Sequence, residues 1–590
     1  MSRAKTFLLF AFAVAGCSEH GTTPPPWGVP ITGGTMIVTR DGSHAVVADP
    51  DRDRIASVEL ATGGLAFDLP LTAGDEPGRI AEDGAGRLHV VLRRAGMVLT
   101  LADATSGAVV DRRFACNEPR GVAYDSANDS IYVACTGGEL VTFPAAGGAA
   151  TRQVRLDRDL RDIVVQNGQL LVTRFRTAEV LRVDATGAIV GRILPPVVQR
   201  FDGGFGGEPT PDGTGMVDAI PAIAWRTIAL PDGRVLMSHQ RQVKSKLDTQ
   251  PGQTGGYGTG CGEGPIEIAN TVVSADGLTA SAVHALGKGA LPVDIAVSKA
   301  GDKIALVVAG GHAVKVVGST ALTAPDQDDC GEPDDDDQGE DDLGAPTSVA
   351  FTPSGDLAIF YPELPGIVVR TQAGASQHTI ALPGGIGFDA GRAVFHRQTA
   401  IGIACASCHP EGREDGLVWD FASLGLRRTQ SVAGGILARA PYHWTGDERD
   451  LPTLMDDVFS QRMAGGTLTD LQKASLGPWL DRLPAPAALS VDTAAAARGQ
   501  AIFESPDTGC VACHGGALMT TNTIANVGKG GAFKAPSLLG VGYRAPYMHD
   551  GTVPTLTDRF GPLGGGDQHG HTSQLTAEQV SDLVQYLSSL

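Results

Sequence analysis

The first two thirds of the chain repeat one pattern of hydrophobic positions. Between about residues 35 and 382, a short apolar run is followed by a turn with glycine or asparagine and then by a second apolar run. Segments 292–306 and 346–360 match best, since their apolar positions and turn glycines coincide. Further copies lie at 36–46, 77–91, 119–133, 161–172 and 226–237. Seven copies predict an all-β propeller of about seven blades over residues 28–383, because sheets closed in a ring protect their edges.

Two glycine-rich insertions and one acidic run interrupt the later repeats. The insertions span residues 199–215 and 250–264 and are expected to form surface loops. The run 326–342 includes four consecutive aspartates, at 334–337. It lacks the spaced ligands of an EF-hand, so a solvated loop is the simpler interpretation, with calcium binding or docking of a basic partner as the alternative.

After Gly384 the pattern changes to helix-compatible segments, and this part of the chain is internally duplicated. Each half begins with a similar segment, residues 391–395 and residues 498–503. The first segment is followed by Cys405-Ala-Ser-Cys408-His409 and the second by Cys510-Val-Ala-Cys513-His514. Downstream, Arg439-Ala-Pro-Tyr-His443 matches Arg544-Ala-Pro-Tyr-Met548. Each half ends in a helix that a capping box introduces, at Thr469 with Gln472 and at Thr576 with Gln579. We therefore expect a multidomain chain in which two mainly α-helical domains, 384–485 and 489–590, follow the propeller.

Composition agrees with this plan and excludes one class of partner. The 590 residues are 42% hydrophobic and 19% charged, which is typical of globular domains, and 78 glycines with 36 prolines indicate many turns. The formal net charge of −20 comes without any cluster of lysine or arginine. Nucleic acid is therefore not an expected partner, whereas a basic redox protein is.

The N-terminus has the layout of a secretory signal. Arg3 and Lys5 precede the apolar run 7–15, which is too short to span a bilayer permanently. Val14-Ala15-Gly16-Cys17 resembles a bacterial lipoprotein box, in which cleavage leaves Cys17 lipidated; the alternative is a plain signal with a free thiol at Cys17. Either interpretation assigns residues 1–17 to a signal segment cleaved before Cys17 and places the protein in the periplasm or cell envelope, with membrane contact only through a lipid on Cys17.

The nine cysteines suit an oxidising compartment. Besides Cys17, four belong to the two CxxCH motifs and four remain, at Cys116, Cys135, Cys261 and Cys330. An even remainder favours disulfides, for example Cys116 with Cys135 and Cys261 with Cys330. Four cysteines allow three pairings, and the sequence does not choose among them.

The two CxxCH motifs predict two covalently bound haems c. Two thiols at this spacing add to the two vinyl groups of a haem, and the following histidine presents an imidazole to the iron. Zinc binding or thiol redox chemistry is the alternative, but histidine follows immediately in both motifs. The proximal iron ligands are then His409 and His514.

The sixth iron ligand decides what each haem does. A strong histidine or methionine ligand favours electron transfer, and an open position permits ligand binding. The internal duplication offers His443 for the first haem and Met548 for the second. Met463 competes for the first, and His549, His569 and His571 compete for the second.

These motifs resemble two known families. The propeller repeats look like those of YVTN or NHL-type proteins. Residues from about 387 to 590 resemble the di-haem cytochrome c peroxidases through the CxxCH motifs, Asn526-Val-Gly528, Pro536-Ser-Leu538 and the 544–551 segment. The resemblance implies an electron-accepting second haem, a first haem that reduces hydrogen peroxide, a small redox protein as electron donor and a calcium ion between the haem domains. Trp444 then matches a tryptophan of that family.

One departure from the family bears on activity. The family's general base is a glutamate that precedes a methionine, and here Arg462 stands in that position before Met463. A permanently charged guanidinium cannot accept a proton, although it can polarise a departing oxygen. Glu448, Asp456 and Asp457 are the candidate replacements.

Three functions follow from these observations. The first is reduction of hydrogen peroxide, with Trp444 and Arg462 as the candidate catalytic residues. The second is a non-enzymatic electron carrier with two six-coordinate haems and the propeller as a docking module. The third places catalysis in the propeller, but its blades show no convergence of metal ligands, and His239 is expected to be a structural histidine.

Overall fold

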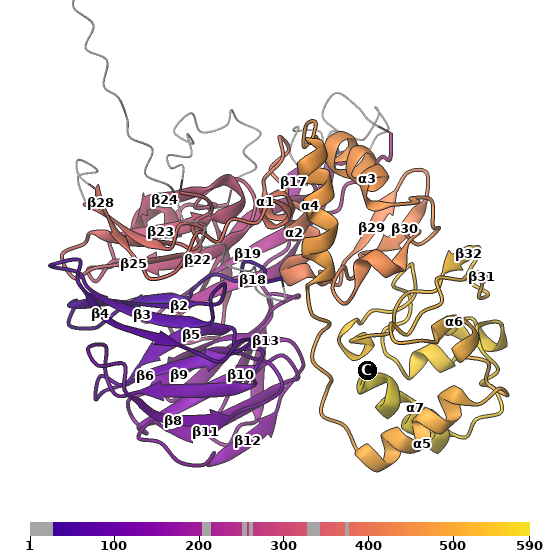
Figure 1. The fold of residues 1–590 in the computed structure, drawn as a ribbon, viewed down its shortest axis with the longest axis horizontal. Helices are drawn as coiled ribbons and strands as arrows, with labels where there is room; N and C mark the ends of the chain where they lie inside the picture. The colour runs from indigo at the N-terminus through magenta and orange to yellow at the C-terminus, as the bar shows by residue number, and fades with distance from the viewer. Residues whose placement is uncertain (1–27, 203–213, 251–255, 259–263, 327–342, 372–376) are drawn as a thin grey trace, which may run out of the picture.

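The computed structural model describes residues 28–202, 214–250, 256–258, 264–326, 343–371 and 377–590. Seven sheets form the propeller, and two smaller helical domains lie beside it (Figure 1). This is the predicted order of domains. Among the described residues, no helix is long and apolar enough to cross a membrane.

Each blade is built from consecutive strands. The first three blades contain β1 (Met36–Val38), β2 (His44–Asp49), β3 (Arg54–Glu59) and β4 (Leu65–Pro70), then β5 (Pro77–Glu82), β6 (Leu88–Leu92), β7 (Met97–Leu101) and β8 (Val109–Phe114), then β9 (Pro119–Asp125), β10 (Ser130–Cys135), β11 (Glu139–Pro144) and β12 (Arg152–Arg155). The fourth contains β13 (Leu160–Gln166), β14 (Gln169–Arg174), β15 (Val180–Val183) and β16 (Ile189–Ile193).

The last three blades differ more from one another. The fifth sheet has β17 (Val198–Phe201), β18 (Met216–Ala229), β19 (Val235–Val243), β20 (Ile266–Val273) and β21 (Ala280–Val283). The sixth has β22 (Pro292–Val297), β23 (Lys303–Val308) and β24 (Ala313–Gly318), and the seventh has β25 (Ser348–Phe351), β26 (Leu357–Tyr361), β27 (Gly366–Arg370) and β28 (Gln377–Ala381). All strand pairs are antiparallel, as expected for blades whose neighbouring strands are joined by short turns.

The ring closes by contact between the first and last blades rather than by a shared strand. β1 packs against β25 on one side and β5 on the other. The backbone N–H of Thr35 donates to Ser348 Oγ at 2.7 Å, and that of Gly34 donates to the Thr347 carbonyl at 3.2 Å. The segment just before β1 therefore joins the two ends of the ring.

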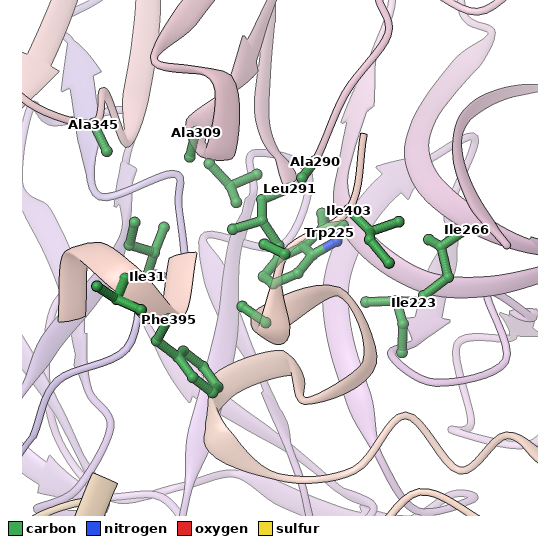
Figure 2. Close-up of a cluster of buried hydrophobic side chains, with 14 of the residues drawn as sticks. Ile31, Ile223, Trp225, Ile266, Ala290, Leu291, Ala309, Ala345, Phe395 and Ile403 are labelled. Atoms are coloured by element: carbon green, nitrogen blue, oxygen red, sulfur yellow. The ribbon is translucent and has the colours of Figure 1, made fainter. Parts of the chain in front are cut away.

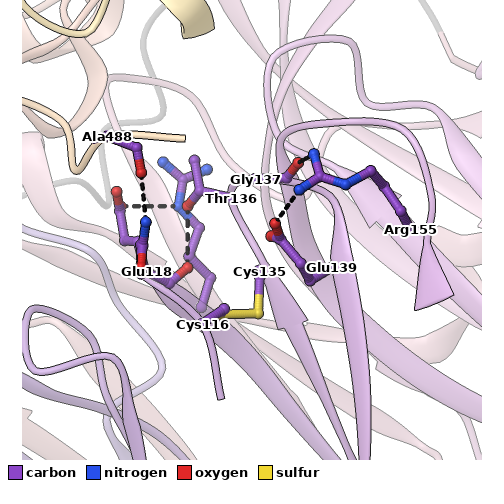
Figure 3. The surroundings of a disulfide bond; sticks show 10 residues. Cys116, Glu118, Cys135, Thr136, Gly137, Glu139, Arg155 and Ala488 are labelled. Carbon is purple, nitrogen blue, oxygen red and sulfur yellow. Dashed lines mark hydrogen bonds and ion pairs between the residues drawn. A yellow bond between two sulfur atoms is a disulfide. The ribbon is translucent and has the colours of Figure 1, made fainter. Parts of the chain in front are cut away.

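One disulfide links Cys116 and Cys135 in the third blade, with their Cα atoms 6.4 Å apart (Figure 3). This confirms one of the suggested pairings. Asn117 beside it donates from Nδ2 to the carbonyl oxygen of Ala488 at 2.6 Å, so the disulfide loop also holds the linker between the helical domains. Cys17, Cys261 and Cys330 lie outside the described residues.

Each helical domain is a small set of helices around one CxxCH motif. The first contains α1 (Ala390–His396), α2 (Cys405–Cys408), the hairpin β29 (Val418–Phe421) and β30 (Gly425–Arg428), α3 (Leu451–Leu454), the π-helix η6 (Met455–Arg462) and α4 (Asp470–Asp481). The second contains α5 (Thr493–Glu504), α6 (Val511–His514), β31 (Ile524–Asn526), β32 (Ala532–Lys534) and α7 (Ala577–Ser588). Short 3-10 turns are η2 (Ala309–Gly311), η3 (Ser319–Thr323), η4 (Pro410–Gly412), η5 (Ile436–Arg439), η7 (Val541–Tyr543), η8 (Asp558–Phe560), η9 (Pro562–Gly564) and η10 (Gly566–His569).

The sequence duplication is also a structural one. α1 packs on α4 and α5 packs on α7. Both expected capping boxes are present, at Thr469 with Gln472 and at Thr576 with Gln579. A Cβ atom at Gly499 in α5 would lie 2.0 Å from the carbonyl oxygen of Asp582 in α7, and the matching Gly391 in α1 is equally close to the carbonyl oxygen of Ser475, at 2.4 Å. The two helix pairs therefore cross at equivalent glycines.

The first helical domain shares a hydrophobic core with the propeller, whereas the second has its own. Phe395 and Ile403 of the first domain pack into one buried cluster with Ile31, Trp225 and Leu291 of the propeller (Figure 2). The second domain is built around a separate cluster that includes Phe503, Val553 and Leu583. The propeller and the first helical domain are thus one packing unit.

The predicted loops are only partly described. Of the acidic run, residues 327–342 lie outside the described part of the chain, and Asp326 forms ion pairs with Arg200 and Arg241, both at 2.8 Å. Residues 203–213, 251–255 and 259–263 of the two glycine-rich insertions are likewise outside it.

Replacing Gly499 with alanine tests the close helix crossing. Glycine-to-alanine changes inside helices usually stabilise, by about 1 kcal/mol. Here the added methyl group meets the Asp582 carbonyl, so we expect the free energy of unfolding of the second helical domain to fall by about 1–3 kcal/mol. Thermal unfolding followed by circular dichroism measures it, with the exposed neighbour Gln500→Ala as the matched control. An unchanged or raised melting temperature for Gly499→Ala would show that the helices do not cross this closely.

Candidate haem sites

Each CxxCH motif lines its own cavity. Cys405, Cys408 and His409 line one of about 250 Å³, the first-site cavity. Cys510, Cys513 and His514 line another of about 260 Å³, the second-site cavity. Both sets of thiols are free of disulfides: Cys405 and Cys408 lie in the short helix α2, and Cys513 lies in α6, which Cys510 directly precedes.

The two candidate proximal histidines are positioned differently. In the first site, His409 Nδ1 lies 3.2 Å from the carbonyl oxygen of Arg413. A hydrogen bond there leaves Nε2 as the ring nitrogen available to a metal. In the second site, His514 Nδ1 has no hydrogen-bond partner among the described residues. Burial lowers the pKa of both imidazoles, that of His514 to about 4, so both are neutral and able to bind a metal.

His443 and Met548 occupy equivalent loops, as the duplication predicted. Each follows a cis-proline and has a positive φ, 64° at His443 and 69° at Met548. In both loops the preceding tyrosine donates to a backbone carbonyl six residues upstream, at 3.2 Å from Tyr442 and 3.1 Å from Tyr547. His443 lines the first-site cavity and Met548 the second. The same backbone therefore presents an imidazole in one site and a thioether in the other.

The imidazole of His443 is oriented by a carboxylate. Its Nδ1 lies 3.1 Å from Asp447 Oδ2. A carboxylate at Nδ1 is the usual partner of a metal-binding histidine, because it fixes the tautomer and leaves Nε2 free. Among the described residues, His443, Asp447 and Glu448 are the group whose potential metal-ligand atoms come within 4.8 Å of one another.

The competing ligand candidates separate into residues that line a cavity and one that does not. Met463 is buried and lines the first-site cavity. In the second site, His549 stacks on Phe533 with ring centroids 3.7 Å apart, and His569 lies 6.3 Å from the His514 ring; both line the cavity. His571 is exposed and lines neither cavity.

Trp444 lies in the wall between the cavities. Six residues line both, namely Arg428, Gln430, Ser431, Ile436, Tyr442 and Trp444. The Trp444 indole N–H donates to the Arg428 carbonyl at 2.7 Å, and its own carbonyl accepts from the backbone N–H of Lys534 at 2.7 Å. The tryptophan is thus fixed to both helical domains.

Buried basic side chains around the cavities fit the carboxylates of a haem. Arg428 lines both cavities, and Arg439 and Arg559 line the second. Each has a buried guanidinium N–H without a hydrogen-bond acceptor in the described part of the chain, at Nε, Nε and Nη1 respectively. Haem carries two propionates, and arginine forks are suited to carboxylates. Each cavity thus combines two thiols, an imidazole and unpaired guanidinium donors with apolar walls. This donor set fits haem c.

The first-site cavity has a polar wall that the second-site cavity lacks, formed by Arg462 and Tyr257. Arg462 lines it and forms an ion pair with Asp457, and Tyr257 from the propeller lines it and hydrogen-bonds to Arg462. Burial raises the pKa of Tyr257 to about 12, so its hydroxyl remains a proton donor. Glu448 lies behind this wall; burial, followed by a hydrogen bond to Asp457, raises its pKa.

Of the three candidate replacements for the missing base, two are therefore close to Arg462. Asp457 contacts it directly, and Glu448 is joined to Asp457. Asp456 pairs instead with Lys473, away from the cavity. Sequence reasoning missed Tyr257, because nothing in a glycine-rich insertion of the propeller points to a haem cavity some 150 residues downstream; the repeated Arg-Ala-Pro-Tyr motif, in contrast, did mark Arg439 and Arg544.

His239 is a structural histidine, as expected. Its Nδ1 lies 2.8 Å from the Gln240 carbonyl and its Nε2 lies 2.9 Å from Thr271 Oγ1. Burial lowers its pKa to about 3. With both nitrogens occupied it presents no free ligand atom.

Comparison with known proteins decides the nature of the second helical domain. Residues 496–590 match the cytochrome c family model. This segment is a cytochrome c domain. It accounts for Cys510, Cys513 and His514 as the attachment site of a covalently bound haem c.

Two curated relatives extend the similarity. The chain is 27% identical over 253 residues to the hydrazine synthase subunit gamma of Kuenenia stuttgartiensis, covering 32% of this chain and 72% of that protein. It is 29% identical over 153 residues to the cytochrome-c peroxidase IdrP1 of Denitromonas iodatirespirans, covering 17% of this chain and 40% of the peroxidase. The predicted resemblance to cytochrome c peroxidases is confirmed, although the chain spans well under half of that relative.

Solved structures are similar in fold. A chain of Kuenenia stuttgartiensis hydrazine synthase matches with a TM-score of 0.42 and 15% identity, over 63% of this chain and 99% of that chain. A streptogramin B lyase matches with a TM-score of 0.34 and 11% identity, over 56% of this chain and 92% of the lyase. At these TM-scores the similarities carry no information about function.

Replacing Met548 with histidine tests the sixth ligand of the cytochrome c domain. Methionine ligation raises the reduction potential of haem c relative to a second histidine. We expect Met548→His to lower the equilibrium constant for reduction of this haem at least tenfold, which is a fall in reduction potential of about 59 mV for one electron. A spectroelectrochemical titration measures it, with the exposed His571→Gln as control. An unchanged potential would assign the sixth position to His549 or His569 instead.

Proposed function

We propose that the chain is an exported di-haem protein that passes electrons from the haem on Cys510 and Cys513 to a haem on Cys405 and Cys408, where hydrogen peroxide is reduced. The observation that carries this proposal is Trp444, which lines both cavities and is hydrogen-bonded to both helical domains. A shared wall of six residues makes the two sites one electron-transfer unit.

Haem iron supplies the one-electron chemistry when bound, and the chain's residues set what each iron can do. Met548 would hold the second iron in a high-potential, electron-accepting form. His443 would occupy the equivalent position in the first site, so peroxide access requires His443 to leave or never to bind. The exposed carboxylate of Asp447 contacts Nδ1 of this imidazole, and we propose that it stays with the ring when His443 moves.

Two residues that line the first-site cavity, together with two carboxyls linked to them, support proton handling there. The Arg462 guanidinium lines this cavity, where it would polarise a departing oxygen. The Tyr257 hydroxyl and the linked carboxyls of Glu448 and Asp457 supply a donor and an acceptor behind it. Because the pKa of Glu448 is raised, this pair can take up the peroxide proton that the family's glutamate would accept.

The alternative function is a non-enzymatic electron carrier. The observation in its favour is the same loop geometry, in which His443 matches Met548 and is held at Nδ1 by Asp447. A histidine fixed in this way makes a permanent second imidazole ligand. The activities named for the two relatives differ, so the choice rests on the ligation of the first haem.

The cell compartment and partners remain part of the proposal. A disulfide within the propeller suits an oxidising compartment. The net charge of −20 suits a basic redox protein as electron donor, since complementary charge speeds encounter. A lipid on Cys17 would place the protein at the membrane surface. Calcium between the helical domains remains a prediction of the family resemblance.

The deciding experiment is electron paramagnetic resonance of the holo-protein, fully oxidised and after selective reduction of the second haem. If the first haem loses His443 on reduction of its neighbour, a high-spin ferric signal appears only in the half-reduced sample, and peroxide turnover follows. A first haem that stays low-spin in both samples would instead identify an electron carrier. Haem content by the pyridine haemochrome assay gives the number of haems per chain.

Replacing Trp444 with phenylalanine tests the route between the sites. Phenylalanine keeps an aromatic ring but loses the indole N–H that donates to Arg428. We expect electron transfer between the haems to slow several-fold in flash-reduction experiments, with both reduction potentials unchanged. Trp479→Phe, in the α1–α4 core and in neither cavity wall, is the matched control. Equal rates in all three proteins would remove Trp444 from the route.

A further inference from the structure

The loop that follows the first CxxCH motif enters the propeller. His409 is followed by the short turn η4, in which Glu411 has a φ of 56° and does not line the haem cavity. The Glu411 side chain is 1% exposed. A carboxylate buried this completely needs charged partners, because an unpaired buried charge is strongly destabilising.

Three arginines of three successive blades supply those partners. Arg93, just after β6, and Arg120 in β9 reach Glu411 Oε2 at 2.9 and 3.2 Å, and Arg161 in β13 reaches Oε1. All three arginine side chains are at least nine-tenths buried. Burial alone would raise the pKa of Glu411, but the three guanidiniums outweigh it and hold the pKa well below the usual value.

A second ion pair fixes the same loop two residues later. Arg413 Nη2 lies 2.9 Å from Glu118 Oε2 of the propeller. The backbone carbonyl of Arg413 is the group that accepts from His409 Nδ1. The propeller therefore holds the loop within the turn, at Glu411, and directly after it, at Arg413, whose carbonyl is the acceptor for the proximal imidazole.

The geometry points to a positioning role: we propose that the propeller, through Glu411 and Glu118, orients the proximal His409 and so sets the reduction potential of the first haem. A buried ion-pair cluster is weak as a source of stability but well suited to specifying one arrangement. The hydrogen bond at Nδ1 governs both ring orientation and ligand basicity. The inference rests on the proposed haem at Cys405 and Cys408, and it gives the propeller a task in redox chemistry beyond docking.

The test compares variants of the full-length holo-protein. Glu411→Gln removes the charge, and Glu411→Asp keeps the charge but is too short to meet all three arginines. Glu118→Gln changes a residue of the propeller and weakens its ion pair with Arg413. Glu179→Gln is the matched control, because Glu179 is a buried propeller glutamate paired with Arg174 and Arg192 and lies outside the cluster. The readouts are haem content, the potential of each haem, and the electron paramagnetic resonance signal of the first.

We expect both Glu411 variants to change the electron paramagnetic resonance signal of the first haem. We expect Glu411→Gln also to raise the equilibrium constant for reduction of this haem at least tenfold, which is a rise in potential of about 59 mV, because a less basic imidazole favours the reduced iron. Glu118→Gln should shift it in the same direction by less. The second haem and the Glu179→Gln control should not change.

Three results would overturn the inference. If Glu411→Asp behaves as wild type while Glu411→Gln shifts the potential, the effect comes from charge alone and not from positioning of His409. Unchanged first-haem signals in all variants would remove any positioning role. If Glu411→Gln does not fold, Glu118→Gln decides, and an unaltered first haem in that variant contradicts the inference. A wild-type protein with one haem per chain would refute the proposed function instead, which the haem assay distinguishes.

Discussion

The buried carboxylate of Glu411 among Arg93, Arg120 and Arg161 is the contact on which the arrangement of the molecule depends. Moving these charges out of water costs several kcal/mol for each ion, and only a closely matched cluster offsets that cost. The cluster therefore permits a single orientation of the first helical domain on the propeller. The shared apolar core around Trp225 and Phe395 supplies the stability that the charges alone do not.

Because the first helical domain packs on the propeller in this way, the two helical domains are not equivalent, although they are duplicated in sequence. The first is packed into the propeller, and the second touches it at fewer points, such as Asn117 with Ala488 of the linker and Arg158 with the Gly542 carbonyl. The same loop holds His443 in one and Met548 in the other. Duplication supplied two similar cavities, and the surroundings made them chemically different.

The difference is concentrated on one side of the first cavity. Tyr257 comes from the propeller and Arg462 from the π-helix, and they meet only because the two parts share a core. The second cavity has Met548 and the histidines 549 and 569 in its wall instead. The wall formed by Tyr257 and Arg462 therefore distinguishes the first cavity from the second.

The amino-acid sequence by itself determined the elements whose signals are local. The blade repeats, the two capping boxes, the CxxCH motifs and the matching of His443 with Met548 all rest on spacing along the chain, and the choice of haem over other cofactors rests on Cys-x-x-Cys-His alone. The sequence suggested two disulfides but left three pairings open, and the proximity of Cys116 and Cys135 in the folded chain selected the first of them. Tertiary structure decided three features: the place of Trp444 between the cavities, the position of Tyr257 in the wall of the first cavity and the burial of Glu411 in the propeller. Each of them joins residues between about 90 and 320 positions apart, through packing that no local sequence pattern encodes.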